Sequence, residues 1–184
     1  MPAMHDMMPL MTRATEQTSA LVRAVRQDQL GLPTPCADFD VKALIGHLEW
    51  VAEMLEPTAL RGERVEQGPY AGDFPDRAER ALASWSRPES WEGVSPAMGG
   101  MPMTALAHMY LIDLVVHGWD LARATGRKHE PDPEAVPRIR QFADQMMEMG
   151  RQRGVFGEPV PVADDAPPFD RLLGLLGRDP AWPH

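Results

Sequence analysis

The sequence predicts an all-α protein, and three observations support that fold class. Four long stretches, near residues 10–29, 40–56, 104–126 and 133–153, carry apolar residues at the spacing of one helix face. Most of the 19 prolines fall at the boundaries of these stretches or between them. No run of alternating strands accompanies them. Together these features favour a helical bundle in a single domain.

The first two helices have clear boundaries. We expect the first from Leu10 to about Gln29, ended by the proline- and glycine-containing segment 31–35. The second is expected to begin with Asp38 or Asp40 as its N-cap and to end at about Glu56, before a proline.

The rest of the chain alternates connections and helices. Residues 57–72 predict an irregular connection, 75–85 a short helix, and 88–103 a short hairpin or only a loop. A long helix follows from Thr104 and ends at Gly126, a residue suited to the left-handed turn after a helix. A helix over 133–153 and a short closing helix over 169–176 complete the prediction.

Length and charge limit the class of protein. With 184 residues, 43% of them hydrophobic, the chain can bury one sizeable core. We expect a frayed N-terminus at residues 1–9, one domain over residues 10–178 and a loose C-terminal tail at residues 179–184. The net charge of −9 argues against nucleic-acid binding. No segment predicts a membrane span or a signal peptide, so a soluble cytoplasmic protein is expected. The single cysteine, Cys36, is interpreted as a packed turn residue rather than a nucleophile.

The helix from Thr104 to Gly126 carries the most informative polar residues. Asp113 and His117 are four residues apart and project together from adjacent turns, although the helix is apolar nearly all round. A buried carboxylate and imidazole are costly to desolvate unless they bind something, and a metal ion is the plainest candidate. The alternatives are an ion pair between Asp113 and an arginine, and a hydrogen-bonded core role for His117.

A third ligand has to come from another helix. His47 lies at the edge of the apolar stripe of the second helix, on the side of Trp50 and Met54. A lone histidine there is more often a core residue, but Asp113 and His117 need a partner. Three such ligands leave a position open for water or substrate, as a catalytic zinc requires. Residue type alone also permits iron(II), nickel or manganese.

The remaining polar residues are assigned lesser roles. Asp120, one turn beyond His117, is predicted to accept a hydrogen bond behind the site or to pair with a basic residue such as Arg123. His108 points roughly opposite His117 and is excluded as a ligand. The other three histidines are expected to face solvent: His5, His129 and His184.

Three segments carry a family resemblance: TPCADFDVKALIGHL, LIDLVVHGWDLARATG and FGEPVPVADDAPPFDRLLGLLGRDP. They resemble an actinobacterial group of DinB-like metal-binding proteins related to the N-terminal domain of mycothiol-dependent maleylpyruvate isomerase, and the resemblance covers about residues 12–180. It implies a DinB-like four-helix bundle with additional short helices and long loops. It also implies a divalent metal, zinc or nickel, at the positions of His47, Asp113 and His117. The wider family more often has His or Glu where this chain has Asp113.

The resemblance implies a thiol-dependent transferase or isomerase that uses mycothiol or a similar small thiol and a small electrophile. The isomerase's additional C-terminal domain has no counterpart here, so maleylpyruvate isomerisation itself is not expected. In this hypothesis the loops at 57–72 and 88–103 shape the pocket. The alternatives are a metal-dependent hydrolase, with Asp120 or Glu49 as general base, and a non-enzymatic stress-related binding or scaffold protein. The first and the last long helices carry apolar residues beyond those that the core needs, so the protein could form a homodimer through these faces.

Overall fold

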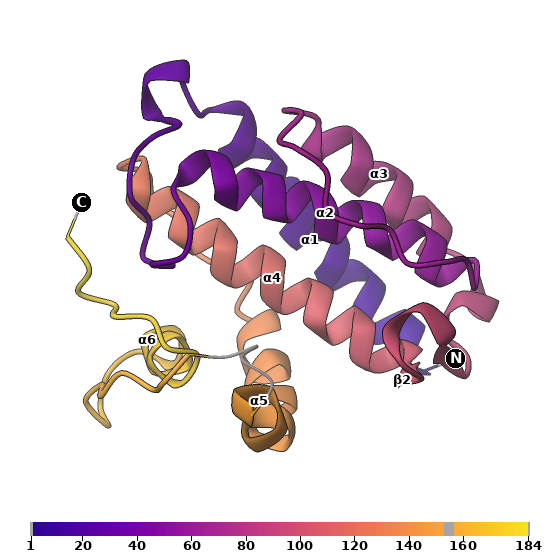
Figure 1. The fold of residues 1–184 in the computed structure, drawn as a ribbon. Coiled ribbons are helices and arrows are strands. Elements are labelled where there is room, and N and C mark those ends of the chain that lie inside the picture. Colours follow the sequence, from indigo (N-terminus) through magenta and orange to yellow (C-terminus); the bar gives the residue numbers. More distant parts are fainter. Residues whose placement is uncertain (1, 153–156, 184) are drawn as a thin grey trace.

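Four of the helices form a bundle in the computed structural model, which describes residues 2–152 and 157–183. They are α1 (Pro2–Arg23), α2 (Val41–Ala59), α3 (Phe74–Trp85) and α4 (Met103–Ala124). The first and fourth of these helices run parallel to each other, and the second and third run in the opposite direction. Helix α1 packs against α3 and α4, and α2 packs against the same two helices, so the four close into a ring (Figure 1). The predicted all-α, DinB-like fold is confirmed.

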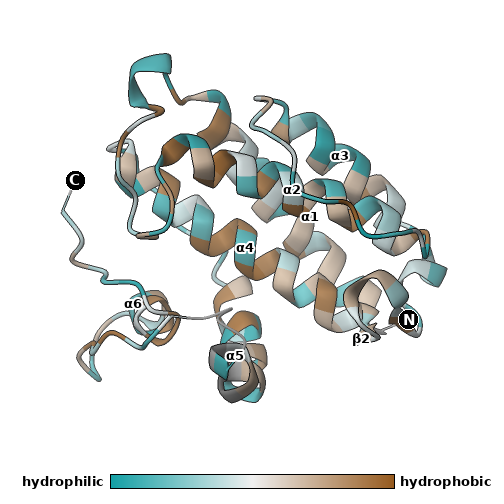
Figure 2. Ribbon diagram, in the orientation of Figure 1, coloured by the Kyte–Doolittle hydropathy of each residue, from teal (hydrophilic) through white to brown (hydrophobic). Residues whose placement is uncertain are grey.

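The central position of α4 follows from its composition. Figure 2 shows hydrophobic residues along every turn of α4, whereas α3 carries long hydrophilic stretches. As predicted, α4 is buried nearly all round, and most of its apolar side chains belong to the main core. The helix ends where expected: Gly126 has φ +69°, and the Arg127 N–H donates to the Ala122 carbonyl oxygen at 2.8 Å.

The N-terminal end differs from the prediction. The first helix begins at Pro2 and not at Leu10, so residues 2–9 are helical and not a frayed segment. Met7 explains the difference, because it is 2% exposed and extends the buried face of α1 by about one turn before Leu10. The helix also ends at Arg23, and the short 3-10 helix η1 (Gln27–Gln29) follows.

Helix α2 begins as predicted and ends later. Asp40 is the N-cap, and its carboxylate accepts from the Ala43 N–H at 2.7 Å. The helix continues through Pro57 to Ala59, because Thr58 and Ala59 are buried and their burial offsets the backbone hydrogen bond that the proline removes.

The connection between α3 and α4 is a hairpin, which decides between the two predicted alternatives. After the 3-10 helix η2 (Pro88–Trp91), β1 (Val94–Ser95) pairs antiparallel with β2 (Met101–Pro102). The 3-10 helix η3 (Pro96–Met98) lies between the two strands and carries Met98 towards α2 and α4, where it lines a cavity.

Two helices lie outside the bundle. Helix α5 (Ala135–Gln152) packs on α4, and α6 (Pro168–Leu175) packs on α5; the predicted last turn of α5, at residue 153, lies outside the described residues. The C-terminal end contradicts the expected loose tail, because Arg123 donates hydrogen bonds to the carbonyl oxygens of Pro180 and Trp182. None of the helices in the described part of the chain is long and apolar enough to cross a membrane.

Candidate metal centre

His47, Asp113 and His117 meet between α2 and α4. The antiparallel packing of these helices places His47, in the second turn of α2, opposite the C-terminal half of α4. Asp113 Oδ1 lies 3.6 Å from His117 Nε2 and 3.8 Å from His47 Nε2. One ligand atom from each of the three residues lies within 4.8 Å of the others, so the group can hold a metal ion.

The separations fit a divalent metal. Zinc–nitrogen and zinc–oxygen bonds of about 2.0–2.2 Å place two ligands of a tetrahedral site about 3.3–3.6 Å apart. The observed distances exceed this range by at most a few tenths of an ångström, so a small side-chain movement closes the set. The shorter reach of Asp113, compared with Glu, is sufficient here. Among the described residues, the close ion-pair contacts of Asp113 are with the two imidazoles, whereas Arg178 interacts with its charge from further away.

Asp120 holds the imidazole of His117 from behind. The Nδ1 atom of His117 lies 3.0 Å from Asp120 Oδ2, and the Asp120 side chain is fully buried. A carboxylate at this distance favours the proton on Nδ1, which leaves the Nε2 lone pair facing Asp113 and His47. The predicted supporting position of Asp120 is therefore seen in the contacts of the structure.

Asp120 pairs with a basic residue, as the sequence suggested, but that residue is Arg178 and not Arg123, which was named as an example. Arg178 follows α6, and its Nη2 atom donates to Asp120 Oδ2 at 3.1 Å. Burial of the guanidinium opposes its charge, but the Asp120 carboxylate outweighs burial and raises the pKa of Arg178. Sequence reasoning missed this residue because 58 positions separate it from Asp120 and no helical spacing relates the two.

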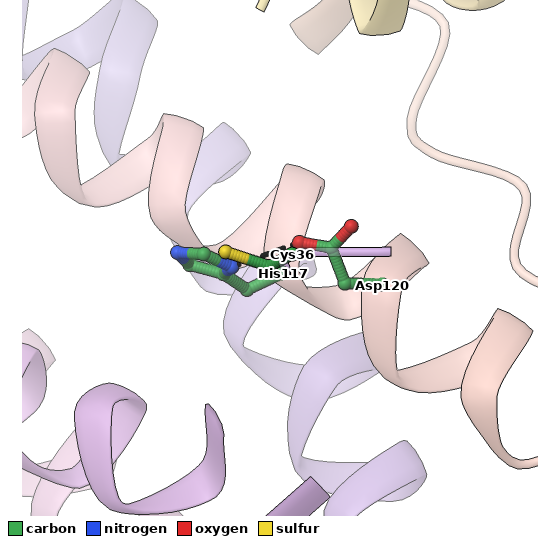
Figure 3. A group of neighbouring side chains, drawn as sticks. All are labelled: Cys36, His117 and Asp120. Atoms are coloured by element: carbon green, nitrogen blue, oxygen red, sulfur yellow. Dashed lines mark hydrogen bonds and ion pairs between the residues drawn. The ribbon is translucent and has the colours of Figure 1, made fainter. Parts of the chain in front are cut away.

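Cys36 lies closer to the site than its interpretation as a turn residue implied. Figure 3 shows the Cys36 and Asp120 side chains beside the His117 ring, and the ligand atoms of the three residues lie within 4.8 Å of one another. Arg178 already pairs with Asp120, and its positive charge disfavours a cation in this second group. Burial raises the pKa of the Cys36 thiol, which opposes the nucleophile alternative.

The ring of His47 is held by aromatic neighbours. Phe39 stacks on it with ring centroids 5.2 Å apart, and His117 meets it edge-on at 5.0 Å. Phe39 belongs to the segment before α2, which the sequence did not mark as part of the site. These contacts limit the rotation of the His47 imidazole and keep it beside α4.

Two residues considered as general bases are occupied elsewhere. The Glu49 carboxylate accepts from the backbone N–H groups of Ala71, Gly72 and Asp73 at 2.8, 2.6 and 3.0 Å, and the residue is 1% exposed. Glu49 therefore anchors the connection before α3. Asp120 is equally engaged, by Arg178 and by His117.

The other histidines lie away from the site. His108 stacks on Phe142 of α5, with ring centroids 4.8 Å apart, which agrees with its exclusion as a ligand. His5 is exposed as expected, and His184 lies outside the described residues. His129 contradicts the prediction: its ring packs on Gly118, where an added Cβ would lie 3.4 Å from His129 Cε1. The loop after α4 folds back on that helix and buries the ring.

Comparison with known proteins identifies the family. A model of the mycothiol maleylpyruvate isomerase N-terminal domain matches residues 11–88. Uncharacterized proteins from two Mycobacterium tuberculosis strains, CDC 1551 / Oshkosh and H37Rv, are each 32% identical over 182 residues, which cover 92% of this chain and 97% of theirs. The chain belongs to the mycothiol maleylpyruvate isomerase N-terminal domain family. No solved structure matches it.

The matched family segment contains α2 with His47 but ends before α4. The family and the geometry of the site together support a divalent-metal site in a DinB-like bundle.

Proposed function

We propose that this protein is a metal-dependent enzyme that uses a small thiol, with mycothiol as the first candidate. It either transfers the thiol to a small electrophile or isomerises that electrophile with the help of the thiol. The observation that carries the proposal is the convergence of His47, Asp113 and His117 on the wall of a cavity of about 610 Å³. Three protein ligands leave coordination positions for a substrate, and a cavity of this size accommodates a small molecule. The family adds support for the thiol.

Zinc is the metal we propose, with nickel as the alternative, because two imidazoles and one carboxylate suit both ions. A bound metal of this kind stabilises a thiol as its thiolate at neutral pH. His47 and His117 would bind through their Nε2 atoms and Asp113 through Oδ1. Asp120 would keep the proton on His117 Nδ1, and Arg178 would keep Asp120 ionised and oriented.

A hydrolase is less well supported by the contacts around the site. Hydrolysis by a metal-bound water is helped by a general base within hydrogen-bond reach. Glu49 is buried and accepts from three backbone N–H groups, and Asp120 is paired with Arg178 and His117. Neither is free to take a proton in the cavity, so a transferred thiolate is the better-supported nucleophile.

Metal content, measured by mass spectrometry on native protein, is the first test. We expect about one zinc or nickel per chain in the wild type and in His5→Ala, an exposed control on α1. We expect its loss in His47→Ala and in His117→Ala. Metal retained in either of these variants would mean that the ligands are wrong.

The reaction is tested on the metal-loaded protein. We expect thiol binding that disappears with chelator, and thiol-dependent conversion of at least one member of a panel of electrophiles. Turnover without thiol would favour the hydrolase. Absence of metal after reconstitution, with unchanged melting on addition of zinc or chelator, would refute both enzyme functions and favour a binding or scaffold protein.

A further inference from the structure

The cavity beside the metal-binding group extends well beyond it. On α2 its lining begins at His47 and continues through Leu55 to Thr58; on α4 it runs backwards from His117 to Leu106. The two ends of each set are eleven positions apart, and the helix rise of about 1.5 Å per residue makes this about 16 Å. The cavity is therefore elongated, with the three candidate ligands at one end.

The two ends of the cavity differ in polarity. Near the candidate ligands the wall also carries Cys36, Asp38 and Arg178. The far end is lined almost entirely by apolar side chains from α2, η3 and α4. They are Val51, Met54, Leu55, Met98, Leu106 and Met109.

The polar groups of Trp50 and Tyr110 along the apolar part are already bonded within the protein, whereas Thr58 adds a hydroxyl at the far end. The Trp50 indole N–H donates to the Val65 carbonyl oxygen at 2.9 Å. The Tyr110 hydroxyl lies 3.2 Å from Thr15 Oγ1 and is buried, which raises its pKa. Within residues 2–152 and 157–183, no cavity-lining side chain has a buried polar atom without a hydrogen-bond partner. This end therefore offers apolar contact and few hydrogen bonds.

Such a wall discriminates strongly between ligands. A sugar or another polyol placed there would lose its hydrogen bonds to water and gain few in return, at a cost for each buried hydroxyl. An alkyl or aryl group would gain from leaving water, and the flexible methionine side chains adapt to its shape.

We propose that the substrate held here is amphiphilic: an alkyl or aryl tail occupies the far end of the cavity, and the reacting head lies at His47, Asp113 and His117. This inference rests on the proposed function for the role of the head. The polar body of a sugar-bearing thiol then lies at the Cys36–Arg178 end, outside the apolar part. The protein thus selects electrophiles with an apolar tail.

The tail is tested separately from the metal. Binding of butyl, hexyl, octyl and decyl alcohols, which carry no metal-binding head, is measured by calorimetry on the full-length protein. We expect the affinity to rise about four-fold per methylene until the cavity is filled, and to be independent of chelator. An affinity that stays flat along this series, or no binding at all, would overturn the inference.

A matched pair of methionines locates the binding site. Met98 lines the cavity, whereas Met101, in β2 of the same hairpin, is half-buried outside its lining. We expect Met98→Gln to weaken binding of the longest alcohol by roughly ten-fold and Met101→Gln to leave it within about two-fold. Equal effects of the two variants would place the alcohols elsewhere and overturn the inference.

Alkyl hydroxamates of the same lengths then test the head. Their extra affinity over the alcohols should depend on metal and on His47. If the alcohols bind as expected and the hydroxamates gain nothing, the metal-dependent function fails while the apolar site stands. If thiol-dependent turnover is found but the alkyl length of the alcohols has no effect on their affinity, the apolar site fails while the metal-dependent function stands.

Discussion

Removing Arg178 should weaken both the fold and the metal site. The Arg178 side chain is 14% exposed, and its partner Asp120 is fully buried, with His117 as its other side-chain contact. Arg178→Ala would leave a buried carboxylate without its cation. Loss of one partner of a buried ion pair costs about 3–5 kcal/mol. We expect the lower end, about 3 kcal/mol, because Arg178 keeps some contact with water and Asp120 keeps its bond to His117.

Thermal unfolding followed by circular dichroism measures this cost. For a chain of this length about 3 kcal/mol corresponds to a fall in Tm of roughly 6–12 °C. Arg171→Ala is the matched control, since Arg171 is exposed on α6 and its side chain donates to the Asp164 carbonyl oxygen and not to a carboxylate of the described residues. It should change stability by less than about 0.5 kcal/mol.

A double-mutant cycle separates the ion pair from general disruption. In an Asp120→Asn background the carboxylate is absent, so Arg178→Ala should cost much less than in the wild type. Zinc affinity should fall about 10–100-fold in either single variant, because the support behind His117 is lost. Arg178→Lys should restore charge but only part of the affinity, since a lysine cannot reproduce the guanidinium geometry. Additive effects in the cycle, or an Arg178→Ala protein that melts like Arg171→Ala, would refute the reasoning.

Three further predictions concern the scaffold. Glu49→Gln should destabilise the protein by about 2 kcal/mol and speed amide exchange over residues 71–73, because three backbone N–H groups lose an ionised acceptor; unchanged exchange would contradict its anchoring role. Gly174→Ala should destabilise the protein by about 3 kcal/mol in urea titrations, since the new Cβ would clash with Val162 Cγ2 and lie 2.7 Å from the Val160 carbonyl oxygen. A change below about 1 kcal/mol would show that α6 shifts freely. Burial lowers the pKa of His108 and of His129, so the unfolded chain binds more protons than the folded protein, and the free energy of unfolding should fall as pH drops below about 6.5. His129→Gln should reduce the slope of the unfolding free energy against pH, and an equal slope in the variant would refute the role of His129.

The predictable part of this protein is what local spacing determines. Apolar periodicity located the long helices, and the i, i+4 relation brought Asp113 and His117 to one face of α4. The N-cap at Asp40 and the turn at Gly126 depend on single residues with strong local preferences, and both were found. Their physical basis is short-range, so one sequence suffices to see it.

The features that the sequence did not predict depend on contacts between residues far apart in the chain. Residues 2–9 end on Pro9, which disfavours a helix that continues through it, and Met7 becomes buried only because the bundle covers it. His129 has a polar, turn-like sequence context, yet the fold presses its ring on Gly118. Arg178 takes the place beside Asp120 that was considered for Arg123, because the chain after α6 returns to α4 and brings the more distant arginine to Asp120. Long-range packing decides each of these cases.

The candidate site is therefore assembled from parts with different degrees of predictability. Within the segment matched by the family model, α2 supplies His47 and no other member of the ligand group. Helix α4 supplies Asp113 and His117 with the spacing that made them visible in the sequence, and the segment after α6 supplies the charge that fixes their support. Because His117 contacts Asp120, and Asp120 contacts Arg178, we expect the C-terminal segment to be part of the functional unit. A chain shortened after α6 should keep the helical bundle and lose most of its metal affinity, which distinguishes this arrangement from one in which the bundle alone forms the site.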